Sequence, residues 1–284
     1  MKKFLLFLCV ISMLSEGLTA QELYVSTEPA SNMPKNSIGL RLTSEVMPGS
    51  DLGFRLVPEV MVGITKNLMG HAILYISDIH QKKQKVEGFG VYGKYRFLSI
   101  DSLQRHFRMA AYGRYSSINN PTYTLTDFSP NSSSYSFQAI DEINLEGDNS
   151  GVQGGLVATQ LIHKLALSAS VNYNRAFNNR GGNELLAGQA TEALGYTFST
   201  GYLTYPKVYT SYEQPNINVY MEFLGKTNLV DSKSFLEAAP ALQVILNSRT
   251  RIDVSKRIEI YGNMARMTKN MWLFRIEHNL FNVF

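Results

Sequence analysis

Along many short segments of this chain, residues alternate between two unlike faces. In GFGVYGKYRF, Phe89, Val91 and Tyr95 share one face, whereas Lys94 and Arg96 share the other. This period of two indicates β-strands, because successive side chains of a strand point to opposite sides. The 3.6-residue period of an amphipathic helix is almost absent. The alternating segments are 37–47, 54–65, 71–79, 88–97, 107–116, 152–161, 165–173, 194–204, 217–225, 236–247, 254–264 and 272–284.

The two faces of these segments fit two different surroundings. One face is aromatic and aliphatic, and the other is small, polar or charged. Most segments are close to the 9–11 residues that a tilted strand needs to cross a bilayer. We therefore predict an all-β fold, a transmembrane antiparallel β-barrel of about 12 strands, with a range of roughly 10–14. Pro58 and Pro240 predict a bulge or a strand end within two of them.

Connection lengths support the barrel. With both termini on the periplasmic side, connections after odd-numbered strands are external and can be long. The longest, 117–151, follows the fifth segment, and we expect it to fold over or into the barrel mouth. Connections after the second and sixth segments are tight, although 205–215 after the eighth is longer than this pattern favours.

A soluble, exported β-sandwich is the alternative fold, because its strands alternate as well. Three features of the sequence count against it. The apolar face carries many Tyr, Phe and Gly residues rather than mainly Val, Ile and Leu; Arg and Lys recur in mid-strand; and the chain ends on an alternating segment whose last residue is Phe284.

The N-terminus predicts export. Lys2 and Lys3 precede an apolar run from Phe4 to Leu14, which is too short to cross about 30 Å of hydrocarbon as a helix. We predict a signal peptide at 1–20, an N-terminal periplasmic lead at 21–36 and the barrel at 37–284. The single cysteine, Cys9, would leave with the signal peptide, so the mature chain has no disulfide.

Charge and motifs exclude several classes of function. The chain carries 27 basic and 23 acidic residues in a mixed pattern, which does not indicate a nucleic-acid partner. No HExxH, paired CxxC, phosphate-binding loop or calcium-loop spacing occurs, so we predict no metal and no cofactor. His278 beside Glu277 cannot form a dyad within one strand, because neighbours point to opposite faces. No motif around His71, His80, His106 or His163 indicates catalysis, and we assign no catalytic residue.

The last 13 residues resemble the C-terminal assembly signal of Gram-negative outer-membrane barrels, in which alternate residues counted back from a final aromatic are apolar. Asn282 and His278 depart from the pattern. The resemblance implies outer-membrane lipid and the barrel-insertion machinery as partners. The matching residues are Trp272, Phe274, Ile276, Leu280 and Phe284.

Three further blocks, 55–78, 88–97 and 240–281, resemble the meta-pathway phenol degradation family of transporter-like outer-membrane channels. The family takes its name from gene context, and most of its substrates are unassigned. The resemblance therefore implies a barrel and passage of small molecules, without naming phenol as the solute. The middle of the chain, about 115–220, carries no such resemblance.

Charged residues on the polar faces are the candidate functional residues. They predict either a channel whose charges tune ion preference, or cross-strand salt bridges that fill a narrow barrel. The preferred function is passive passage of small solutes. The alternatives are a non-conducting barrel that binds through its long loop and, less favoured, a lipid-modifying barrel enzyme. The lumen-lining candidates are Arg41, Arg55, Glu59, Lys94, Arg96, Arg108, Arg114, Glu222, Glu259, Arg275 and Glu277, with Glu87 as a further acidic partner.

Overall fold

The computed structural model describes residues 24–48, 53–79, 83–129, 134–208, 211, 213–267 and 269–284, with the backbone alone for 124–129 and 134–137. The predicted signal peptide and His80 lie outside these residues. Within the described part of the chain, no helix combines the length and apolar character needed to cross a membrane.

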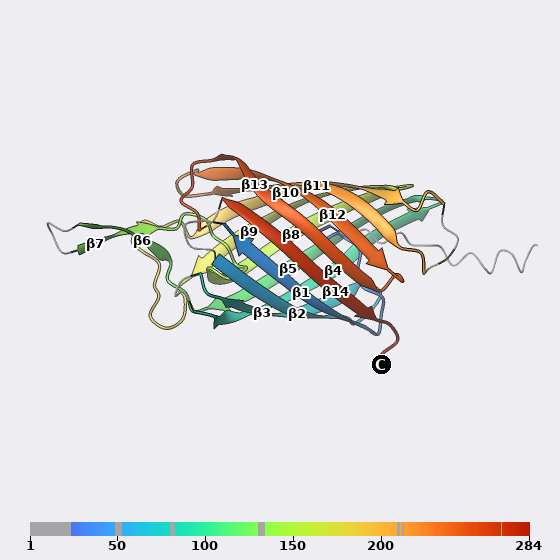
Figure 1. The fold of residues 1–284 in the computed structure, drawn as a ribbon, viewed down its shortest axis with the longest axis horizontal. Helices are drawn as coiled ribbons and strands as arrows, with labels where there is room; N and C mark the ends of the chain where they lie inside the picture. Colours follow the sequence, from blue (N-terminus) through green and yellow to red (C-terminus); the bar gives the residue numbers. More distant parts are fainter. Residues whose placement is uncertain are drawn as a thin grey trace, which may run out of the picture.

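Twelve antiparallel strands of the described chain form one closed barrel, which confirms the predicted fold class (Figure 1). Each strand pairs with its neighbours in sequence, except that β5 pairs with β8, and β1 closes the ring against β14. The strands are β1 Ser37–Met47, β2 Gly53–Gly63, β3 Leu68–Ser77, β4 Lys85–Ser102, β5 Arg105–Ile118, β8 Ser150–Ile162, β9 Leu165–Phe177, β10 Glu192–Tyr205, β11 Asn216–Asn228, β12 Ser234–Leu246, β13 Thr250–Gly262 and β14 Asn270–Leu280.

The two faces of the strands have opposite chemistry. On β14, Trp272, Phe274 and Ile276 are 40%, 45% and 49% exposed on the outside, whereas Leu273 and Glu277 are buried inside. The same division recurs around the ring, so the outer wall is apolar and the inner wall is largely polar. An outer wall that is apolar around the whole ring indicates that this wall contacts an apolar environment rather than water.

Two details of the strands differ from the sequence prediction. β14 ends at Leu280 rather than at Phe284; beyond it, the amide of Val283 donates to the carbonyl of Asn36 at 2.8 Å. The prolines mark neither a strand end nor a bulge. Pro58 lies within β2 and Pro240 within β12, each paired with one neighbouring strand and skipped in the ladder to the other. A missing N–H accounts for such one-sided gaps.

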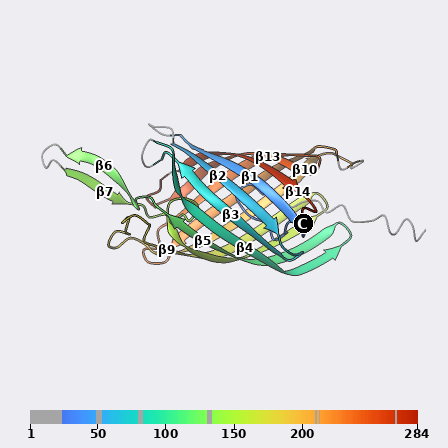
Figure 2. The same cartoon turned by 90° about the horizontal axis from the view of Figure 1, so that it is seen from below.

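The two ends of the barrel differ in their connections. Short connections such as Ile64–Asn67 and His163–Lys164 lie at the end that also holds the C-terminus, which we call the turn end. Longer connections lie at the opposite end, which we call the loop end. There β6 Tyr123–Ser129 and β7 Ser134–Ala139 form a separate two-stranded sheet that projects away from the barrel (Figure 2).

Candidate functional site: the barrel lumen

The predicted charged residues lie on the inner wall. Two of them are at the rims: Arg96 donates to the carbonyl of Lys66 at the turn end, whereas Glu259 pairs with Arg266 at the loop end. The others lie between the rims, where the strand alternation points them inward. These are Arg41, Arg55, Glu59, Lys94, Arg108, Arg114, Glu222, Arg275 and Glu277.

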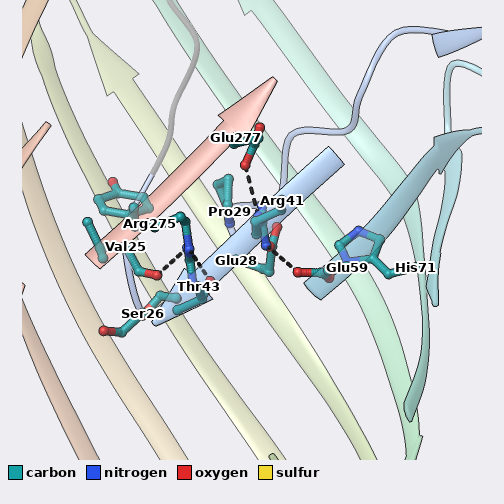
Figure 3. A network of polar contacts seen from close by, with 12 residues as sticks. Val25, Ser26, Glu28, Pro29, Arg41, Thr43, Glu59, His71, Arg275 and Glu277 are labelled. Carbon is teal, nitrogen blue, oxygen red and sulfur yellow. Dashed lines mark hydrogen bonds and ion pairs between the residues drawn. The ribbon is translucent and has the colours of Figure 1, made fainter. Parts of the chain in front are cut away.

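The first described residues, 24–34, lie inside the barrel as a segment without regular secondary structure (Figure 3). Tyr24, Val25 and Ala30 are fully buried, and the ring of Tyr24 contacts that of Tyr220 on β11 at 5.5 Å. Most of the predicted periplasmic lead is therefore placed within the lumen. We call residues 24–34 the plug segment.

A cluster of ion pairs joins the plug segment to the wall (Figure 3). Arg41 on β1 contacts Glu28 of the plug at 2.7 Å, Glu59 on β2 at 3.2 Å and Glu277 on β14 at 2.9 Å. Arg41 and Glu277 are also direct cross-strand partners in the β1–β14 ladder. One guanidinium thus pairs with carboxylates from three separate parts of the chain, which offsets part of the cost of burying these charges.

Residues 140–149 fold back over the loop end of the lumen, as predicted for the long connection, whereas β6 and β7 of that connection project away from the barrel. We call them the lid loop. Asp148 contacts Arg55 at 2.6 Å, Glu142 contacts Arg266 at 2.8 Å, and Ile143 is buried. The carbonyl of Ile143 also accepts a hydrogen bond from Lys226 at 2.5 Å.

Nearby charges stabilise the ionised forms of the groups that attach the lid loop to the wall. Burial raises the pKa of the Glu142 carboxyl, but the positive charges of Arg266 and Lys226 outweigh burial and hold that pKa below its ordinary value. At the loop end, a hydrogen bond to Asp141 raises the pKa of Lys233. Both shifts favour the ion pairs that attach the lid to the wall.

Between plug and lid, the barrel encloses a cavity of about 220 Å³. Arg275 borders it and donates to Thr43 Oγ1 at 3.0 Å and to the carbonyl of Val25 at 2.5 Å, yet among the described residues it forms no ion pair. The cavity is lined by tyrosines, amides and charges of both signs. The tyrosines are Tyr75, Tyr92 and Tyr112 on β3–β5, and the amides are Gln153, Asn172 and Asn174 on β8–β9. The charged residues are Arg41, Arg114, Lys226, Arg257 and Arg275 together with Glu28, Glu45, Glu59, Glu142 and Glu146.

Sequence reasoning missed part of this lumen. Arg251 and Asp253 form a buried pair at 2.6 Å on β13, outside the predicted segment, which begins at 254. Their alternation with Ile252 was the available signal. Arg266 lies in the β13–β14 connection and binds Glu142, Glu237 and Glu259, and no strand pattern could have placed it there.

The described histidines occupy separate positions. His71 faces the lumen beside Glu59, His163 lies in the β8–β9 turn, and His278 on the outer wall contacts Thr250. His106 contacts Asp101 at 2.7 Å, and Ser99 donates to that same carboxylate rather than to the imidazole. In the described residues, no group of three or more His, Cys, Asp or Glu side chains is arranged to hold a metal ion.

Comparison with known proteins gives the fold. An outer membrane channel from Pseudomonas putida F1 superposes with a TM-score of 0.55 at 8% identity, over 90% of this chain and all of that one. The NanC porin has a TM-score of 0.49 at 11% identity, over 85% of this chain and all of that one. OccAB1 of Acinetobacter baumannii has a TM-score of 0.40 at 11% identity, over 80% of this chain and 57% of that one. No family model and no curated protein matches the chain.

Proposed function

We propose that this chain is an outer-membrane β-barrel that passes small polar solutes passively through its lumen. The observation that carries the proposal is a closed barrel with an apolar outer wall around a polar, charged cavity. The apolar wall suits lipid, and the polar interior suits hydrated solutes. The predicted export signal and the resemblance to C-terminal assembly signals support the same location. The proposal includes no catalytic role.

Arg275 supports a preference for anions. Its neighbours on the wall are mostly matched: Arg41 has three carboxylate partners and Arg257 has Glu237 at 2.5 Å. Arg275 donates only to neutral oxygens in the described chain and borders the cavity. Asp253, its partner in the β13–β14 ladder, forms its ion pair with Arg251, so the charge of Arg275 is offset less than that of a directly paired guanidinium and attracts a passing anion more strongly.

Single-channel recording tests the proposal. The refolded mature protein in a planar bilayer should give discrete conductance steps, with a reversal potential under a KCl gradient that favours chloride. Arg275→Gln should shift that potential toward zero. Arg175→Gln is the matched control, because Arg175 lies exposed on the outer wall in a pair with Glu192. A folded, heat-modifiable protein that never conducts would refute the channel.

A non-conducting binding barrel is the second candidate. The projecting β6–β7 sheet favours it, because this sheet shares no ladder with the barrel and offers a separate surface (Figure 1). The buried ion pairs of the lumen also suit a filled barrel. A folded protein that shows no conductance in the bilayer would favour this function. The family resemblance of 55–78, 88–97 and 240–281 supports the channel without naming its solute.

A further inference from the structure

The barrel holds the plug segment mainly by its backbone. The buried carboxylate of Glu222 on β11 accepts hydrogen bonds from the amides of Val25, Ser26 and Thr27 at 2.9, 2.8 and 2.8 Å. Carboxylates bound by several backbone N–H groups form strong, charge-assisted contacts. These donors exist in every residue except proline, so the contact selects a bent backbone that turns three consecutive N–H groups toward one acceptor, rather than a particular side chain.

Cations of the wall bind the carbonyls of the same segment. Lys94 on β4 donates to the carbonyls of Pro29 and Ser31 at 2.6 and 2.8 Å. Arg251 on β13 donates to the Tyr24 carbonyl at 2.9 Å, and Arg275 on β14 donates to the Val25 carbonyl. The anchors thus come from strands on different sides of the ring, and the bound segment crosses the lumen.

The segment is also attached by the Glu28–Arg41 ion pair and by the ring contact of Tyr24 with Tyr220, but none of its contacts is a strand ladder. It belongs to no strand, and Glu28 is its only charged residue. Its connection to the barrel is short: Asn36, next to the start of β1, donates to the carbonyl of Gly63. Release would therefore require no strand to break, and the freed anchors would face a hydrated lumen.

We propose that the lumen contains a peptide-binding site built from Glu222, Lys94, Arg251 and Arg275, that the plug segment occupies it reversibly, and that release of the segment opens the pore. The inference rests on the proposed channel function. The ligand class is a peptide whose backbone bends so that three consecutive free N–H groups face one carboxylate. The chain's own residues 24–31 supply it in this structure.

A disulfide tests whether release is required. Thr27 Oγ1 and Ser199 Oγ on β10 lie 3.1 Å apart, which brings the two side chains close enough for Thr27→Cys/Ser199→Cys to form a bridge. The predicted mature chain has no other cysteine. The matched control, Ser170→Cys/Thr197→Cys, joins a wall pair 2.7 Å apart on β9 and β10 without touching the plug.

Oxidation with diamide should abolish conductance of the plug-bridged protein, and dithiothreitol should restore it. The control pair should conduct equally in both states. If the oxidised plug-bridged protein conducts like the unmodified protein, the plug does not gate the pore. If neither protein conducts in any state, the proposed channel function fails instead.

A separate synthetic peptide tests the binding site itself. A variant lacking residues 24–34 should conduct continuously, and a synthetic peptide of that sequence should block it. N-methylation of the three nitrogens that contact Glu222 keeps every side chain and removes the donors, so half-block should need at least about tenfold more peptide. Equal block by both peptides would refute the backbone site. If the deletion variant does not fold, the disulfide pairs decide the question.

Discussion

Replacing Arg55 by methionine tests how strongly buried charges support this barrel. The Arg55 side chain is 1% exposed and contacts Glu87 at 3.0 Å and Asp148 at 2.6 Å. Methionine keeps an apolar stem of similar reach, so the loss is mainly electrostatic. It leaves three buried carboxylates without this cation, because Glu45 also lies 3.7 Å from Arg55, although Glu87 keeps its hydrogen bond from Ser77. Breaking a buried pair in this way costs about 3–5 kcal/mol.

Urea unfolding in lipid vesicles measures this cost. Trp272 is the only tryptophan of the chain, and its position on the outer wall makes its fluorescence a probe of barrel unfolding. Arg175→Met is the matched control, because that arginine is 49% exposed and an exposed pair contributes about 0–1 kcal/mol. Adding Glu87→Gln to Arg55→Met should recover part of the loss. If Arg55→Met is no more destabilising than the control, the buried network does not stabilise the fold.

Three further predictions concern the loop end. Burial raises the pKa of Glu142, but the charge of Arg266 lowers it by more, so the net shift is downward. The ionised Glu142 therefore stabilises the lid loop above pH about 4.5. This stabilisation should be lost as the pH falls below that value, so lid proteolysis should increase in acid, and Glu142→Gln should weaken this pH dependence, since Asp141 and Asp148 also pair with cations. Arg114→Gln should leave Glu146, now paired at 2.7 Å, without its cation and shift the reversal potential toward cations. This shift should shrink at 1 M salt, and an unchanged potential at low salt would contradict it. Replacing 123–139 by a short glycine–serine linker should leave barrel stability and conductance unchanged, because the β6–β7 sheet shares no ladder with the barrel; a lower urea midpoint would show that it does contribute.

The strands of the barrel could be predicted from the sequence because their two surroundings impose one period. An apolar outer wall and a polar inner wall both require alternation, so each strand carries the pattern along most of its length. The ends were less accurate. β4 runs over Lys85–Ser102 rather than 88–97, since hydrogen bonding between strands continues past the point where the apolar alternation weakens. The predicted segment 254–264 likewise starts after Arg251 and Asp253, although these residues alternate with Ile252 at the start of β13.

The position of the plug segment inside the lumen could hardly be predicted from the sequence. Residues 24–34 contain two prolines and short polar side chains, a composition that usually indicates an exposed lead. Its main contacts to Glu222 use backbone N–H groups, which nearly every residue has. The partner was visible as a charge on a polar face, but a single acidic residue does not reveal whether it will meet a cation, a solute or a peptide amide. Such pairings depend on distances set only by the closed ring.

The order of the strands along the chain determines when the plug segment can bind inside the barrel. Val25 meets Arg275 across 250 residues of sequence, and Tyr24 meets Arg251 across 227. These partners lie on β14 and β13, which follow the other strands of the described barrel in the chain. Contacts between such distant parts of a chain form late, because a long loop must first be closed. The plug segment can therefore reach its final position only after β14 has paired with β1. A barrel that still lacks β13 and β14 also lacks two of the anchors that hold the plug, Arg251 and Arg275.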